Sequence, residues 1–164
     1  MADKGFSFEK AFKKTDVGAI EVKEIPPSRL LETASAGRYF DNNDGLFMEL
    51  FRYIRQNGVS MTVPVEADLK DGAMRFYVGT KDADRDLPDA GKVRVKEMPM
   101  RQVVSLGARG TYSEKNFKEA EKKLLAWFAK NDQHRPSAPA YAVFWDGPYK
   151  PGFLKRFEVH VPVN

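Results

Sequence analysis

Two histidines and two strand glutamates are the residues of this 164-residue chain whose types fit metal or acid–base chemistry. His134 lies in a polar loop and His160 lies near the C-terminal end, so nothing in the spacing brings the imidazoles together on a metal ion. The chain contains no cysteine, which excludes thiolate sites, cysteine nucleophiles and disulfides. Phosphate-loop, zinc-peptidase and serine-hydrolase motifs are also absent. We therefore predict no metal site, assign no catalytic residue and do not favour an enzymatic role.

Glu66 and Glu158 fall on expected strands close to aromatic residues. A buried glutamate with a raised pKa would be suited to act as a general base. Both positions, however, lie on the polar side of an alternating pattern, and His160 shares the parity of Glu158. This alternation predicts solvated side chains.

The segment from Trp145 to Pro151 combines aromatics, a cation and two prolines in a turn between the last two expected strands. Such a stiff turn would form a rim suited to a flat apolar ligand with acidic groups, with Lys150 available to a carboxylate. A tight hairpin that packs Trp145 explains the same residues.

An internal repeat organises the chain. Gly18–Pro26 is echoed 73 residues later by Gly91–Pro99. Each half contains two alternating segments, a helical pattern and two further alternating segments. The expected strands cover residues 19–25, 29–34, 62–67 and 73–79 in the first half, and 92–98, 102–108, 140–145 and 155–163 in the second.

The helical patterns carry start and stop signals. In the first half an apolar stripe over residues 46–54 follows capping side chains at 41–44 and ends at Gly58. In the second half Thr111 and Glu114 fit a capping box ahead of a stripe over residues 117–128.

These elements predict an α+β fold with an antiparallel arrangement of about eight strands and two helices, built from two pseudo-symmetric β-β-α-β-β repeats. Repeat 1 spans about 17–80 and repeat 2 about 91–163, within one domain over residues 15–164. We expect residues 1–14 to form an N-terminal arm packed along that domain or a frayed terminus, rather than a membrane-surface helix.

The charge and hydropathy of the chain indicate which kinds of partner to expect. The chain has 27 basic and 23 acidic residues, interspersed, which indicates a solvated surface rather than a nucleic-acid interface. No apolar run is long enough to span a bilayer, so we expect no stable membrane insertion. The N-terminus shows no signal-peptide pattern, from which we expect a cytoplasmic protein. We favour a monomer.

Several segments together resemble the SOUL haem-binding family. They are VGAIEVKEIP (17–26), Glu32-Thr33, LFMELFRYI (46–54), MTVPV (61–65) and the ending WDGPYKPGFLKRFEVHVPV, in the family's order and over nearly the whole chain. Phe157 and His160 depart from the family's closing motif, which usually has Asn and Trp at these positions. The resemblance implies a distorted antiparallel β-barrel flanked by two helices.

The resemblance also implies that haem or a related tetrapyrrole binds in a cleft between the first helix and the loop that joins the last two strands. By position this assigns the site to Phe47, Met48, Phe51 and Arg52 on the helix, and to Tyr149 and Lys150 on the loop. Aromatic and Met side chains would cover the porphyrin face, while Arg52 and Lys150 would pair with the propionates.

Some family members are thought to ligate iron through a histidine near the first helix. This chain has no histidine before His134. We therefore expect a carrier or buffer that holds a tetrapyrrole by apolar contacts and propionate pairing, without strong axial ligation.

A second hypothesis assigns the chain to another class of function. The duplicated architecture is similar to gyrase-inhibitor-like ligand-binding domains, which implies a hydrolase or an effector sensor. Its candidate residues are Glu66 or Glu158 beside Tyr53 or Trp145. A glutamate deep in an aromatic pocket would favour this hypothesis, whereas a surface cleft rimmed by Lys and Arg would favour tetrapyrrole binding.

Overall fold

A curled eight-stranded antiparallel sheet forms the body of the molecule in a computed structural model that describes residues 8–35, 39–147 and 150–164. The strand order is β2-β8-β10-β9-β5-β6-β3-β7, and every neighbouring pair is antiparallel. The predicted α+β class is confirmed. The strands are β2 (Ile20–Ile25), β3 (Ser28–Ala34), β5 (Val65–Asp68), β6 (Ala73–Tyr77), β7 (Arg94–Met98), β8 (Arg101–Arg109), β9 (Tyr141–Phe144) and β10 (Arg156–Val163).

The order of the strands is symmetric between the two halves of the chain. Exchanging β2, β3, β5 and β6 for β7, β8, β9 and β10 reproduces the same order read from the other end. Two equivalent β-β-α-β-β units related by a twofold axis would give this arrangement. The common origin of the halves stays a prediction.

Two helices, α1 (Tyr39–Gln56) and α2 (Glu114–Lys130), pack against the same side of the sheet in the described part of the chain. α1 contacts β3 and β6, whereas α2 contacts β8 and β10. Leu46 and Leu50 of α1 and Leu124 of α2 join strand residues such as Phe76 and Val159 in one buried apolar core. Neither helix covers the other side of the sheet, which is its concave face.

The residues predicted to begin and end the two helices are confirmed only in part. Gly58 ends α1 in a left-handed conformation (φ +64°), and Val59 N–H donates to the Ile54 carbonyl. The cap predicted for α2 is wrong, because Ser113 accepts from the Asn116 N–H. The start predicted for the first helix at 41–44 lies inside α1.

Pro64 divides the single strand predicted at residues 62–67. Proline has no N–H to donate, so the ladder breaks there into β4 (Thr62–Val63) and β5. β4 pairs in parallel with β1 (Glu9–Lys10). No helix in the described ranges is long and apolar enough to cross a membrane.

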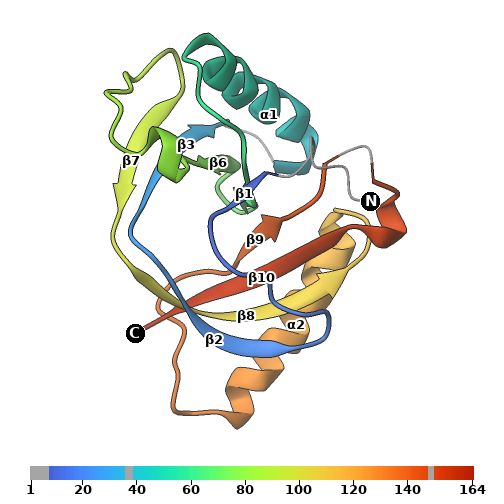
Figure 1. The fold of residues 1–164 in the computed structure, drawn as a ribbon. Coiled ribbons are helices and arrows are strands. Elements are labelled where there is room, and N and C mark those ends of the chain that lie inside the picture. The colour runs from blue at the N-terminus through green and yellow to red at the C-terminus, as the bar shows by residue number, and fades with distance from the viewer. Residues whose placement is uncertain (1–7, 36–38, 148–149) are drawn as a thin grey trace, which may run out of the picture.

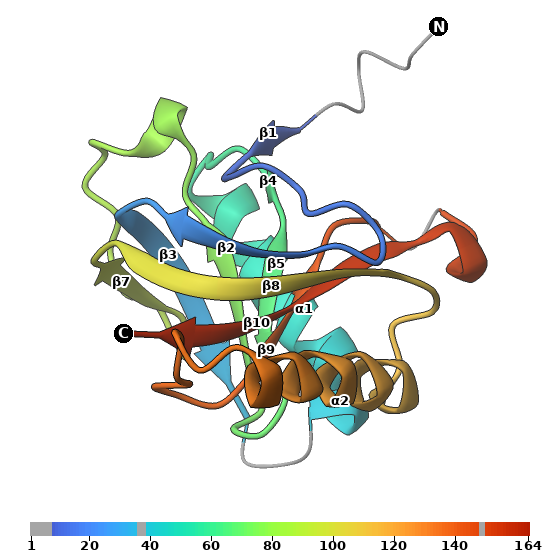
Figure 2. The same ribbon diagram turned by 90° about the horizontal axis from the view of Figure 1, so that it is seen from below.

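The N-terminal segment, residues 9–16, closes the concave face. Figure 2 shows α2 and this segment on opposite sides of β8 and β10. Ala11 N–H donates to the Val63 carbonyl at 2.8 Å, and the Thr15 hydroxyl hydrogen-bonds to that of Ser105 at 2.9 Å. A Cβ on Gly107 would lie 2.2 Å from the Asp16 carbonyl oxygen, so the docked segment requires a glycine there.

We expect Gly107→Ala to lower the free energy of unfolding by about 2 kcal/mol, because the added methyl overlaps the backbone of the N-terminal segment. Urea unfolding measures the loss, and limited proteolysis should cut the loosened segment first. The matched control is Gly45→Ala, whose Cβ meets nothing within 4 Å and which should gain about 0.5–1 kcal/mol in a helix. Equal stability of the two variants would contradict the docking role of Gly107.

Candidate functional site

Glu158 of β10 is fully buried beneath the N-terminal segment, where its carboxylate accepts five hydrogen bonds. One oxygen accepts from the Thr15 N–H at 2.8 Å and the Trp145 indole N–H at 2.7 Å. The other accepts from the Lys23 ammonium at 2.8 Å and the Ser105 hydroxyl at 3.0 Å. The solvated Glu158 predicted from strand parity is therefore wrong.

The fifth bond joins Glu158 to His160, which is also fully buried, at 2.7 Å. Burial alone would raise the pKa of Glu158, but the hydrogen bond from His160 and the Lys23 ammonium hold it at about 2. Burial lowers the pKa of His160, so the imidazole is neutral at pH 7. We assign the proton of the neutral His160 ring to Nε2, which donates to Glu158. His160 Nδ1 then accepts a hydrogen bond from the Tyr141 hydroxyl.

Glu66 of β5 is also fully buried, so its predicted solvation is wrong as well, and it forms a second cluster. It accepts from Arg75 Nε at 2.9 Å, from Arg101 Nη2 at 2.8 Å and from the Tyr77 hydroxyl. Arg75 also pairs with Glu32 at 2.8 Å. Burial favours the neutral carboxyl, but the guanidinium groups of Arg101 and Arg75 outweigh it and hold the pKa of Glu66 at about 2.

Tyr141 connects the two clusters across the concave face. Its hydroxyl accepts from Arg101 Nη1 at 3.1 Å and lies 3.2 Å from His160 Nδ1. Burial raises the pKa of Tyr141, so the phenol stays protonated. A continuous hydrogen-bonded network thus runs from Glu158 to Glu66. Because both carboxylates are ionised and paired, neither is suited to accept a proton as a general base near neutral pH.

The ring of Phe12 covers this network. Its centroid lies 5.8 Å from Tyr77 and 5.5 Å from Trp145, both edge to face, and 5.6 Å from His160. The Lys23 ammonium lies 4.7 Å from the same ring. The space that an aromatic ligand would use on the concave face is therefore filled by the chain's own segment.

Sequence reasoning missed Phe12, Lys23, Arg75 and Arg101 as members of this network. A signal for one pair is present, because Arg75 lies directly opposite Glu66 in the β5–β6 register. Of the aromatics expected beside a buried glutamate, Trp145 is in place, whereas the Tyr53 hydroxyl donates to the Pro88 carbonyl instead.

The predicted helix residues lie on α1, which packs on the side of the sheet opposite the concave face. We call this the outer side of the molecule. Phe47 and Phe51 are half-buried and stack with ring centroids 5.9 Å apart, and Phe47 also meets Phe76 edge to face at 5.4 Å. Met48 is 50% exposed and Arg52 is exposed. Phe47 and Phe51 thus belong partly to the core, while Met48 and Arg52 are exposed to solvent.

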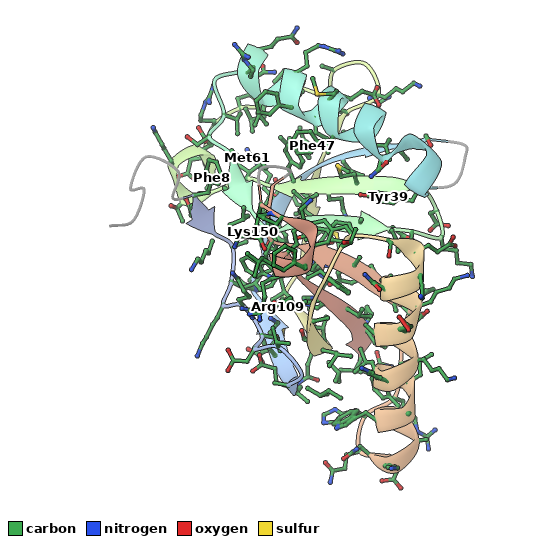
Figure 3. The ribbon with its side chains drawn as sticks, turned by 90° about the vertical axis from the view of Figure 1, so that its right-hand side faces the viewer. Phe8, Tyr39, Phe47, Met61, Arg109 and Lys150 are labelled. Carbon is green, nitrogen blue, oxygen red and sulfur yellow. The ribbon has the colours of Figure 1, made fainter. Side chains whose placement is uncertain are left out.

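α1 and the described part of the β9–β10 loop are both visible from the side drawn in Figure 3. Figure 3 shows Phe47 on α1 and Lys150 on this loop, with Met61 also visible from that side. Lys150 pairs with Asp146 at 3.1 Å and is partly exposed. Tyr149, the other predicted loop residue, lies outside the described residues.

His160 is fully buried in the hydrogen-bonded network at the concave face. The His134 ring stacks on that of Trp127 of α2, with ring centroids 6.1 Å apart. Within residues 8–35, 39–147 and 150–164 no group of three metal-ligating side chains is found. The described side chains of α1 and of the β9–β10 loop include aromatic, thioether and cationic groups but no imidazole.

The family model described as SOUL heme-binding protein matches residues 6–162. No curated protein matches the chain. Among solved structures, the EcmrR C-terminal domain is similar at a TM-score of 0.69 and 17% identity, over 89% of this chain and 97% of that one. The chain spans 57% of the longer EcmrR chain in its DNA complex.

Two further structures share the fold. A hydrolase from Listeria innocua has a TM-score of 0.58 at 14% identity, over 92% of this chain and 94% of its own. SAV2435 bound to tetraphenylphosphonium has a TM-score of 0.50 at 12% identity, over 89% and 94%. At these identities the likeness concerns the fold alone.

The buried carboxylates make stability depend on pH. Both have folded pKa values near 2, below the ordinary value of about 4.3, so the unfolded chain binds their protons first as the pH falls. We expect the stability that these carboxylates contribute to be retained above about pH 5 and to fall by about 3 kcal/mol per carboxylate towards pH 2. His160, with its lowered pKa, adds a decline of the same sign that begins below about pH 6.5.

Urea unfolding at a series of pH values measures this dependence. His160→Gln should flatten the curve between about pH 6.5 and 5 while leaving the fall at lower pH. A stability that stays constant from pH 7 to pH 3 would show that the carboxylates are not held as ion pairs.

We expect Glu66→Gln to cost about 3–5 kcal/mol, because it removes the counter-charge of the mostly buried Arg101 guanidinium and leaves Arg75 with Glu32 alone. The matched control is Glu97→Gln, which breaks the surface pair with Arg29 and should cost less than about 1 kcal/mol. Urea unfolding at pH 7 compares the two, and equal costs would contradict the central role of Glu66.

Proposed function

Because this chain belongs to the SOUL heme-binding protein family, we propose that it binds haem or a related tetrapyrrole where α1 faces the β9–β10 loop, as a carrier or buffer. The observation that carries the proposal is the stacked pair of Phe47 and Phe51, half-buried on α1 beside the exposed Met48. Such a surface suits the broad apolar face of a porphyrin.

Cations support the same placement. Arg52 is exposed one turn after Met48 on α1, and Lys150 lies on the facing loop with only Asp146 as an ionic partner among the described residues. Guanidinium and ammonium groups would pair with the two propionates of a tetrapyrrole. Tyr149 is proposed as a further contact from its position in the family motif.

We propose binding without an axial histidine. His160 already uses both ring nitrogens, on Glu158 and Tyr141. His134 is packed against Trp127. A site that relies on ring contacts and propionate pairing would accept iron-free porphyrins nearly as well as haem.

A second candidate function is supported by one observation. Glu66 and Glu158 lie wholly buried among Tyr77, Tyr141 and Trp145, which is the arrangement expected for a small-molecule-binding domain of the gyrase-inhibitor type. A ligand there would have to displace Phe12. The filled concave face and the paired carboxylates therefore favour the outer side.

The test is a hemin titration followed in the Soret band, with protoporphyrin IX followed in parallel by fluorescence. We expect saturation near one equivalent for both ligands. Lys150→Glu and Met48→Glu should each weaken binding about tenfold, through lost propionate pairing and through a charge placed against the ring. Met100→Glu, which changes an equally exposed methionine elsewhere, is the control and should bind as the parent protein does.

Other outcomes discriminate between hypotheses. Unchanged affinity in both variants would remove the proposed site, and a low-spin spectrum lost in His134→Ala would show histidine ligation. If no tetrapyrrole binds, the second candidate is tested with tetraphenylphosphonium in the Trp127→Phe variant, whose remaining tryptophan is Trp145. Saturable quenching there would favour the concave face.

A further inference from the structure

Phe153 and Leu154 form an apolar tip on the β9–β10 loop. Phe153 is 72% exposed, the highest value among the exposed large hydrophobic side chains of the described chain, and its neighbour Leu154 is 44% exposed. Both lie in η3 (Gly152–Leu154), a single helical turn that projects from the body of the molecule in Figures 1 and 2. Adjacent large apolar groups held in water indicate a contact with something outside the chain.

Backbone hydrogen bonds and close packing fix the position of this tip. Leu154 N–H donates to the Pro151 carbonyl at 2.9 Å, and Gly110 N–H donates to the Lys155 carbonyl at 2.8 Å. Gly152 packs so closely on Thr111 that a Cβ would lie 2.5 Å from its hydroxyl. Because the loop is fixed, presenting the two apolar side chains requires little further ordering.

Cations surround the tip. Lys150 and Lys155 flank it in sequence, and the exposed Arg109 lies opposite Arg156 in the β8–β10 register. Asp146 is the one carboxylate in residues 145–156, and it is occupied by Lys150 and by the Arg156 N–H. The tip therefore combines exposed apolar groups with an excess of positive charge.

The N-terminal segment adds to this charge. Lys14 lies over the Trp145 ring at 5.2 Å, near the base of the loop. Burial lowers the pKa of Lys14, and the positive charges of Arg156, Lys10 and Lys150 lower it further, against the effect of Asp146. Basic side chains of two distant segments thus share this end of the molecule.

We propose that this tip docks on an anionic lipid bilayer, with Phe153 and Leu154 entering the interface and the surrounding cations meeting lipid headgroups. Peripheral attachment of this kind needs both an apolar group and a basic patch, and the tip supplies both. Two side chains are too few for a stable protein interface, which buries about 1,000 Å² or more. The proposal does not depend on tetrapyrrole binding.

The experiment is co-sedimentation of the full chain with vesicles of phosphatidylcholine alone and of phosphatidylcholine with 30% phosphatidylserine. We expect binding to the anionic vesicles only, weakened severalfold between about 0.1 and 0.5 M salt. The double variant Phe153→Ser/Leu154→Ser should lose at least about tenfold in affinity, and Lys155→Gln about fivefold.

Matched controls separate the tip from general surface effects. Met100→Ser removes an exposed apolar group at the other end of β8, and Lys130→Gln removes a cation at the far end of α2, so both should bind as the parent protein does. No binding to anionic vesicles, equal binding to neutral ones, or unchanged binding of the double variant would overturn the proposal. So would a dimer in light scattering that the double variant abolishes.

Discussion

Two carboxylates without access to water have to be compensated inside the protein, and the concave half of this fold is arranged around that requirement. An unpaired buried charge is costly enough to unfold a domain of this size. Glu66 is compensated by Arg75 and Arg101, and Glu158 by Lys23 together with backbone and indole N–H groups. These partners come from β2, β6 and β8, from Trp145 directly after β9 and from the N-terminal segment, so the two charges hold distant strands and the closing segment together.

The same requirement determines where a ligand has room. A concave sheet face is a natural binding surface, but here Phe12 and Thr15 occupy it and the Thr15 N–H completes the shell of Glu158. Displacing the segment would remove a hydrogen bond from a buried charge as well as apolar contact. Binding on the outer side of α1 requires no such loss. The fold is therefore compatible with small-molecule binding on either face, and this cost on the concave face is the reason for proposing the outer one.

The alternation of residues predicted the strands because it is a local property of an extended backbone, and β2, β3, β8 and β10 lie within one or two residues of the expected ranges. The same alternation failed for Glu158 and His160. Parity distinguishes two faces of a strand, but not whether a second layer covers the polar one. That layer comes from Phe12, more than a hundred residues away, and its docking depends on Gly107 leaving room for the Asp16 carbonyl. Met48 and Arg52 lie exposed beside the apolar stripe of α1, a position that the periodicity of a single amphipathic helix determines by itself.

The β9–β10 loop contributes to both proposed surfaces, with Lys150 at one and Phe153 at the other. Asp146 accepts from the Arg156 N–H and pairs with Lys150, while the Tyr112 hydroxyl donates to the Arg156 carbonyl. These bonds join the two ends of the loop at its base. Lys150 and the turn that carries Phe153, which packs on Thr111, thus belong to one loop that is closed at its base. A ligand on the α1 side and a bilayer at the tip would then change each other's affinity through shared charge, because each anionic partner neutralises cations that the other uses. That coupling is electrostatic, so it weakens as salt screens it, whereas a hinge would not.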